Sequence, residues 1–397
     1  MKRCLLGFVI FLSLLMAGCV TYHPKAEYRN LTQETWMRHI ETNPDIWMRK
    51  ADVWFLNGRA TEAELHNLRA PRSVSVSLMN VNVDDFTSIK VNGNFQVQIY
   101  GSNAEHNSLN IYGSNAAIRS IGVSVRNHTL YLEQGKVAPE SGRYAVVRIG
   151  VRRLNSLTQM GCGSIEAVLI NSKHFTMTET AGASGPVFVA GHLNLVSVTH
   201  EGVGTINVIG VDSTHTAIYS RGAGAINLCG KIGVKTIYHT GSANINLIGA
   251  NSQSLEICAY GSGKIGIKGR VGLTKVDAGG KVRVYVDSVI SHKLNVTLKD
   301  DACVGLLGCA DDLTIYNRDD TRFFGRFLCT RNAYVKAADR SQVNVTASDK
   351  FFAHAYAAST VYFYGPRSIM SAFTSSYGRV MYIMNADFRM CFPAGVR

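Results

Sequence analysis

From about residue 160 onward, apolar and polar residues alternate in short segments that recur about every twenty positions. One isoleucine position repeats at intervals of 20, 19 and 20 residues, at Ile206, Ile226, Ile245 and Ile265. A second apolar position precedes each of these by eight residues, at Val198, Ile218, Ile237 and Ile257. Alternation with a period of two predicts β-strands. Two strands in constant register predict that each repeat is one coil of a β-solenoid.

Glycines follow many of these strands, at Gly210, Gly230, Gly249 and Gly269. Glycine suits the corners of a coil, where a side chain would clash or where a positive φ is needed. After about residue 270 the strand periodicity continues but the regular glycines disappear. This last region therefore contains either further coils or a diverged second copy. The pattern as a whole predicts an all-β parallel solenoid with about 20 residues per coil.

The segment 24–71 has a different pattern, with apolar residues at helical spacing in 32–42 and 44–57. A short α-helical segment is therefore expected ahead of the solenoid. All three tryptophans of the chain lie in this segment, at Trp36, Trp47 and Trp54. They either pack the helices together, cap the end of the solenoid, or form a docking surface, since tryptophan is enriched at interface hot spots.

The first residues have the features of an export signal: Lys2 and Arg3, then an apolar run too short for a permanent membrane span. The run ends in Met-Ala-Gly before Cys19 and resembles the lipobox of bacterial lipoproteins. This resemblance implies a mature chain that begins at Cys19 and is acylated there, which anchors it in a membrane. Val20 stands where an aspartate would indicate inner-membrane retention, so the outer membrane is expected. The alternative is an ordinary cleaved signal peptide with a chance cysteine.

The net charge of the chain indicates which classes of partner it favours. The formal net charge is +13, and leaving out Lys2 and Arg3 reduces it by two, to +11. A basic surface favours acidic lipopolysaccharide, an anionic polysaccharide or an acidic protein. The sequence contains no arginine- and lysine-rich run of the kind that binds nucleic acid, so no nucleic-acid partner is expected.

The register of the repeat assigns side chains to faces. If the isoleucines point inward, then Asn207, Asn227 and Asn246 point outward and stack as a file, and Tyr219 and Tyr238 stack in the same way. The asparagines form either a structural amide ladder or a polar surface for a glycan or a protein. In the second case the tyrosine rings would lie against sugars.

The cysteines and acidic pairs give weaker indications. Cys309 and Cys329 are one period apart and form either a disulfide or stacked free thiols. No Cys/His spacing suits a zinc site, and no cofactor is expected. The dense acidic pairs could act as general acid and base in glycoside cleavage, although aspartate is also favoured by turns. These pairs are Asp300-Asp301, Asp311-Asp312 and Asp319-Asp320. The histidines, including His200 and His239, are expected to be ordinary surface or turn residues, and no catalytic residue is assigned.

Ahead of the clear repeats, the stretch Phe86 to Ile99, with Gly93 at its centre, leads through further short strands to Gly161-Cys162-Gly163-Ser164-Ile165. This progression resembles the GIN domain (DUF2807), a family described as the head domain of autotransporter adhesins, over roughly residues 80–270. The resemblance implies a right-handed β-helix on an exported or lipid-anchored bacterial protein, and it implies no established reaction.

The chain is therefore expected to comprise a signal peptide (1–18), an anchor linker with a helical segment (19–72), a GIN-like solenoid (73–270) and a continuing or second solenoid region with a cap (271–397). The favoured function is a non-catalytic scaffold on the outer membrane that contacts other envelope proteins, as a subunit of a large secretion-type assembly. The alternative is a surface adhesin for glycan or host surfaces. A polysaccharide-cleaving enzyme is the third hypothesis.

Overall fold

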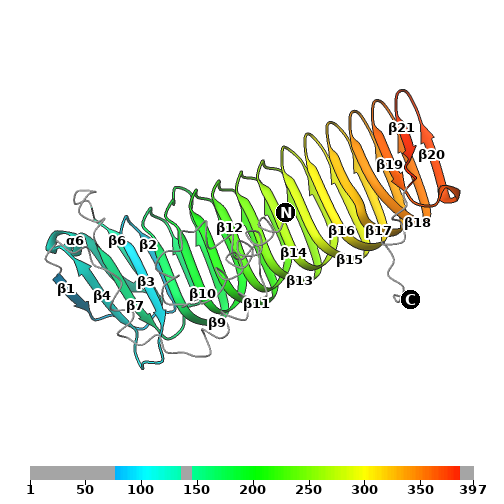
Figure 1. Ribbon diagram of the computed structural model, residues 1–397. Helices are drawn as coiled ribbons and strands as arrows, with labels where there is room; N and C mark the ends of the chain where they lie inside the picture. The colour runs from blue at the N-terminus through cyan, green and yellow to red at the C-terminus, as the bar shows by residue number, and fades with distance from the viewer. Residues whose placement is uncertain (1–76, 136–144, 385–397) are drawn as a thin grey trace, which may run out of the picture. The chain divides into compact units, whose positions relative to one another are not determined.

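The computed structural model describes residues 77–135 and 145–384 (Figure 1). The chain divides into two compact units, 1–56 and 57–397, and the described residues belong to the second. They form a parallel β-solenoid of about 11 turns with roughly 20 residues per coil, which confirms the predicted fold. The predicted helical segment with Trp36, Trp47 and Trp54, the signal peptide and Cys19 lie outside the described residues.

Each central coil is one long strand that bends at its corners. The ten strands are β9 (Ile165–Glu179), β10 (Val187–His200), β11 (Thr205–Ser220), β12 (Ala225–His239), β13 (Asn244–Ala259), β14 (Lys264–Ala278), β15 (Arg283–Leu298), β16 (Cys303–Asn317), β17 (Arg322–Ala337) and β18 (Gln342–Ala355). Neighbouring strands pair in parallel, and the register joins Ile206 to Ile226, Ile226 to Ile245 and Ile245 to Ile265. All four side chains are fully buried, so the periodic isoleucines form one stack inside the solenoid.

The turns of the coils require glycine where two backbones approach closely and residues with a positive φ at other positions. A Cβ on Gly224 would lie 1.6 Å from the carbonyl oxygen of Gly204 in the preceding coil, so a larger residue cannot occupy this turn. From Gly280 onward the turn places one residue in the left-handed region, with φ of 68° at Gly280 and 64° at Asp300. Aspartate tolerates this conformation better than most residues. Aspartate therefore replaces glycine at this turn in the coils after Gly280, at Asp300, Asp319 and Asp339.

The coils before residue 160 are assembled from segments that are distant in the sequence. Their elements are β1 (Ser77–Val81), β2 (Ser88–Asn92), β3 (Gln96–Gly101), β4 (Ser108–Gly113), α6 (Asn115–Arg119), β5 (Ile121–Arg126), β6 (Thr129–Gln134), β7 (Val146–Val151) and β8 (Ser156–Gln159). One part of strand β9 pairs in parallel with β3, and another part pairs in parallel with β8. Strands β4 and β5 pair antiparallel with β7 and β6, respectively, so the parallel stack ends in antiparallel strands here.

The C-terminal coils continue the same sheet. Strands β19 (Thr360–Tyr364), β20 (Met370–Thr374) and β21 (Arg379–Tyr382), with the short 3-10 helix η2 (Arg367–Ile369), extend the stack from β18 in parallel register. Figure 1 shows the coils following one another from green to red without a change of direction. Of the two expectations for the region after residue 270, further coils of the same solenoid are therefore what the structure contains.

Candidate functional site: the outward faces of the solenoid

The three predicted asparagines form a hydrogen-bonded amide ladder. Asn227 donates through Nδ2 to Oδ1 of Asn207 at 2.8 Å, and Asn246 donates to Oδ1 of Asn227 at 2.9 Å. Asn207 and Asn227 are only 5% and 7% exposed, so the ladder presents little amide surface to a ligand. These contacts favour the structural role over the binding role.

Tyr219 and Tyr238 are direct register neighbours on β11 and β12 and point out of the coil, as the sequence indicated. Their exposed fractions are 46% and 37%. On the following coils, Cys258, Asp277 and Thr297 take the equivalent position, so the tyrosine file stops after two members.

Aromatic residues return to the same face on the last coils, where sequence reasoning did not find them. We call this surface the aromatic strip; its members are Tyr316, Tyr334, Phe352, His354, Tyr356 and Phe373. The exposed fractions of Tyr316, Tyr334, Phe352 and Phe373 range from 37% to 57%. Isolated apolar residues are common on protein surfaces, but a contiguous exposed patch indicates an interaction surface.

The rings of the strip contact one another across neighbouring coils. Tyr334 and Phe352 stack with their planes 4° apart and their centroids at 5.4 Å, and Tyr316 lies 6.0 Å from Tyr334. His354 meets the ring of Phe373 edge-on at 4.9 Å and lies 5.3 Å from Tyr356. Because parallel strands hold these residues in register, the strip is a row of rings on a rigid support.

One cation lies within this aromatic surface. Lys336 on β17 is the register neighbour of Tyr316 on one side and of His354 on the other. Its ammonium is 5.9 Å from the centroid of the Tyr356 ring, within the range of a cation–π contact.

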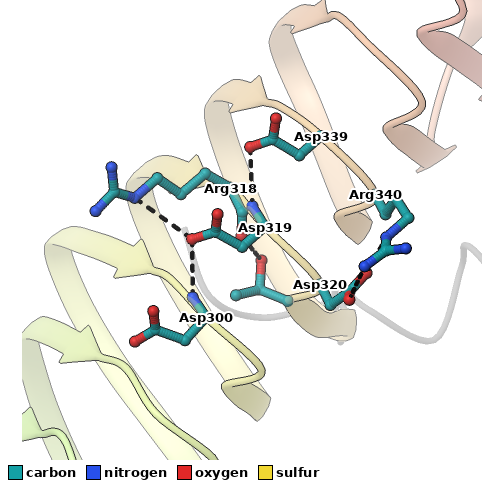
Figure 2. A network of polar contacts seen from close by, with 7 residues as sticks. Asp300, Arg318, Asp319, Asp320, Asp339 and Arg340 are labelled. Carbon is teal, nitrogen blue, oxygen red and sulfur yellow. Dashed lines mark hydrogen bonds and ion pairs between the residues drawn. The ribbon is translucent and has the colours of Figure 1, made fainter.

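The predicted acidic pairs in the turns serve the backbone. The Asp300 carboxylate accepts the N–H of Gly280 at 2.7 Å, that of Asp319 accepts the N–H of Asp300 at 2.9 Å, and that of Asp339 accepts the N–H of Asp319 at 3.0 Å. Figure 2 shows this aspartate ladder from coil to coil, with Arg318 and Arg340 beside it. Arg340 also donates through Nε to Oδ1 of Asp320 at 2.7 Å. Turn geometry and neighbouring backbone amides thus account for these carboxylates.

The pair Asp311-Asp312 lies within β16 and not in a turn between strands, which corrects the sequence-based placement. Asp311 is hydrogen-bonded to Nδ1 of His292 at 2.8 Å and forms an ion pair with Arg331 at 3.4 Å. Asp312 accepts a hydrogen bond from Asn332 at 2.8 Å. Both carboxylates therefore have structural partners on neighbouring coils.

A row of polar side chains, which we call the buried polar file, lies inside the solenoid, where only apolar residues were expected. Gln159, Glu179, His200, Ser220 and His239 occupy one inward register position on successive coils, and all are fully buried. The prediction that His200 and His239 are surface or turn residues was therefore wrong. Their neighbours along the strands are apolar core residues, and the twenty-residue repeat carries these polar side chains into the interior.

The contacts in this buried polar file centre on Glu179. Its Oε2 is 3.0 Å from Nε2 of His200, and its Oε1 accepts the backbone N–H of Gly204 at 2.8 Å. Both ring nitrogens of His239 lack a hydrogen-bond partner in the described part of the chain. Burial, and next the charge of His200, lower the pKa of His239, and the backbone of Gly241 opposes this only in part. Glu179, His200 and Ser220 on successive coils are the residue types of a hydrolase triad. However, all three side chains are fully buried, so a substrate cannot contact them.

Cys229, Cys309 and Cys329 lie on strands β12, β16 and β17, respectively. Cys309 and Cys329 face each other in register on β16 and β17, and their disulfide stays a prediction. Burial raises the pKa of the Cys229 thiol to about 11, which disfavours the reactive thiolate. Residues 77–135 and 145–384 contain no group of three or more histidine, cysteine or acidic side chains placed to hold a metal ion. Within the same ranges, no helix is long and apolar enough to span a membrane.

Comparison with protein families gives one match, to the model described as "Putative auto-transporter adhesin, head GIN domain" (DUF2807), over residues 85–286. The match covers half of the chain and includes the coils from β2 to the start of β15. The chain belongs to this family. This GIN-domain membership confirms the resemblance seen in the sequence and extends its C-terminal boundary beyond residue 270.

Several solved structures are similar to this GIN-domain protein. One is described as a putative adhesin from Bacteroides fragilis, with 13% identity, a TM-score of 0.23, and coverage of 78% of this chain and 98% of that one. Another is described as a putative lipid binding protein from Parabacteroides distasonis, with 11% identity, a TM-score of 0.22, and coverage of 79% and 98%. A putative cell adhesion protein from Clostridium sporogenes has 15% identity, a TM-score of 0.26, and coverage of 49% and 99%. No curated protein matches the chain.

Proposed function

We propose that this GIN-domain protein is a non-catalytic binding protein of the bacterial cell surface, an adhesin that engages its partner through the aromatic strip. The observation that carries the proposal is the row of exposed rings from Tyr316 to Phe373 on one face of the last coils. The adhesin description of the family supports the same class of function. Aromatic side chains supply large contact areas for binding at a small cost in conformational entropy.

The position of the strip in the chain suits display. The lipobox-like sequence before Cys19 supports lipid anchoring at the N-terminal end of the mature chain, in the outer membrane. The strip lies on coils formed by residues 303–374, more than 280 residues after that cysteine. An acylated Cys19 would hold the protein at the membrane.

A scaffold within a larger envelope assembly is the second candidate. It is favoured by exposed apolar side chains at the C-terminal end of the stack, where Tyr377 is 81% and Met384 is 86% exposed. Such residues suit contact with another protein subunit. Polysaccharide cleavage is not proposed, because the acidic pairs that suggested it are held by backbone amides, arginines and asparagine.

The test uses cells that express the full chain. Protease treatment of intact cells should digest the protein, and cells should adhere to immobilised mucin or epithelial surfaces. The triple variant Tyr334→Ser/Phe352→Ser/Phe373→Ser should lose most of this adherence. The double variant Tyr219→Ser/Tyr238→Ser removes exposed rings from the same face of distant coils and should retain it. Full protection from protease until the outer membrane is opened would contradict the adhesin function and favour the scaffold.

A further inference from the structure

We infer that the aromatic strip binds a glycan that carries carboxylate groups, with sugar rings against Tyr334 and Phe352 and a sugar carboxylate at the ammonium of Lys336. This inference rests on the proposed function and names the ligand class of the same surface. It concerns a defined patch on β16, β17, β18 and β20.

The geometry of the rings is the first argument. The rings of Tyr334 and Phe352 stack with nearly parallel planes, 4° apart, and both side chains are partly exposed. A pyranose ring has flat faces of C–H groups that stack on exposed aromatic rings, whereas its hydroxyls stay in water at the rim. Because the coils that carry these rings repeat about every 4.8 Å along the stack, the strip suits a polymer of repeating rings that runs along the solenoid.

The charge of the strip is the second argument. Lys336 is exposed, and no ion pair within the part of the chain that the structure describes includes it. Two basic side chains on nearby coils do have acidic partners: Arg331 has Asp311, and Arg340 has Asp320. An unpaired ammonium among aromatic rings is complementary to an anion.

The outward positions around Lys336 are also without acidic residues. These positions include Thr314, Tyr316, Tyr334, Phe352, His354, Ser371 and Phe373, followed beyond the strand ends by Arg318 and Tyr356. By contrast, Glu256 and Asp277 occupy equivalent positions of this face on earlier coils. The last coils are therefore the part of the face that tolerates a negatively charged ligand.

A nucleic acid has the same two kinds of group, stacking bases and anionic phosphates. However, nucleic-acid affinity depends on neutralising several phosphates with lysine and arginine. The strip offers one unpaired lysine, and the nearby Arg318 is 3.6 Å from Asp319. A single unpaired cation does not supply the several phosphate contacts on which nucleic-acid affinity depends.

The experiment measures binding of the full chain, purified in detergent, to a fluorescent hexasaccharide of galacturonate and to its methyl ester. The ester keeps the sugar faces and removes the charge. The acid form should bind more tightly than the ester, and added salt should weaken the binding of the acid form only. Lys336→Met should reduce affinity for the acid about tenfold, the size expected for one charge-assisted contact, and leave the ester unchanged. Lys235→Met, at an exposed lysine on β12, is the matched control and should change neither.

The outcomes separate this inference from the proposed function. If the strip variants abolish adherence but wild-type protein binds the acid and the ester equally, or binds neither, the carboxylate-glycan inference is overturned and the adhesin function stands. Tighter binding of a single-stranded oligonucleotide that depends on Lys336 would also overturn it, in favour of nucleic acid. If the strip variants leave adherence intact, the proposed function fails and the inference fails with it.

Discussion

Glu179 and His200 are in contact in the interior of the solenoid, with Oε2 of the carboxylate 3.0 Å from Nε2 of the ring and neither side chain exposed to solvent. The pair joins two successive coils, since the two residues are register partners on β9 and β10. Transfer of such groups from water into a protein interior is costly, and their mutual attraction offsets the cost only when both partners are present.

Removal of one partner should therefore destabilise the solenoid strongly. Glu179→Leu leaves His200 and the Gly204 N–H without the carboxylate, and we expect a loss of about 3–5 kcal/mol in the free energy of unfolding. The double variant Glu179→Leu/His200→Leu should recover much of this loss, since an apolar pair suits the core. Urea unfolding monitored by circular dichroism measures both. Glu201→Gln is the control: its exposed ion pair with Arg221 should contribute no more than about 1 kcal/mol. A double variant no more stable than the single one would contradict this account.

The stability of the solenoid should also fall in mild acid because of His239. Its pKa is lowered by burial below the ordinary value of 6.5, so the folded chain holds fewer protons at this site than the unfolded chain. The neutral His239 therefore contributes fully to the free energy of unfolding above pH 6.5. This contribution decreases as the pH falls from 6.5 toward the lowered pKa, because the unfolded chain takes up the proton first. Each unit of lowering corresponds to about 1.4 kcal/mol.

Melting temperatures measured between neutral pH and pH 5 test this. His239→Leu should flatten the decrease, because Leu298 already occupies the equivalent position on a later coil without cost to the register. His215→Leu changes an exposed histidine and should leave the pH dependence as in the wild type. An equally steep decrease in His239→Leu would assign the acid sensitivity to groups other than His239.

The sequence predicted the fold from residue 160 onward because each coil there is one continuous repeat, with Ile206 and Ile226 as direct register partners. The coil before residue 160 that pairs with β9 consists of β3 and β8, which are more than fifty residues apart in the chain. Such coils produce no period, so only the family resemblance indicated them.

The same reasoning explains which surface features were predicted. The asparagine ladder was visible because one residue type recurs at one position. The aromatic strip was missed because Tyr316 and Tyr334 occupy two different positions of the face, at a spacing of 18 residues instead of 20. The buried polar file was missed because glutamate, histidine and serine succeed one another at a position that Ala259 and Ala278 fill elsewhere.

The amide ladder allows a third prediction. Asn227 donates to Asn207 and accepts from Asn246, so Asn227→Ala removes two hydrogen bonds and takes a partner from the buried Asn207 and from the part-buried Asn246. At about 1 kcal/mol for each hydrogen bond, we expect a loss of about 2 kcal/mol in urea unfolding. Asn246→Ala removes one hydrogen bond at a less buried position and should cost about half as much. Equal losses in both variants would show that the ladder does not act through these contacts.

The aspartate ladder allows a fourth prediction, in which backbone conformation and hydrogen bonding are separated. Asp319 has a φ of 61°, and its carboxylate accepts the N–H of Asp300. Asp319→Gly keeps the left-handed conformation but loses the acceptor, Asp319→Asn keeps both, and Asp319→Ala keeps neither. We expect Asn to change stability least and Ala to cost about 1–2 kcal/mol, with Gly between them. Urea unfolding of the three variants measures the order. If Gly were as stable as the wild type, the left-handed turn alone would explain the aspartates, and the hydrogen bonds between coils would contribute nothing measurable.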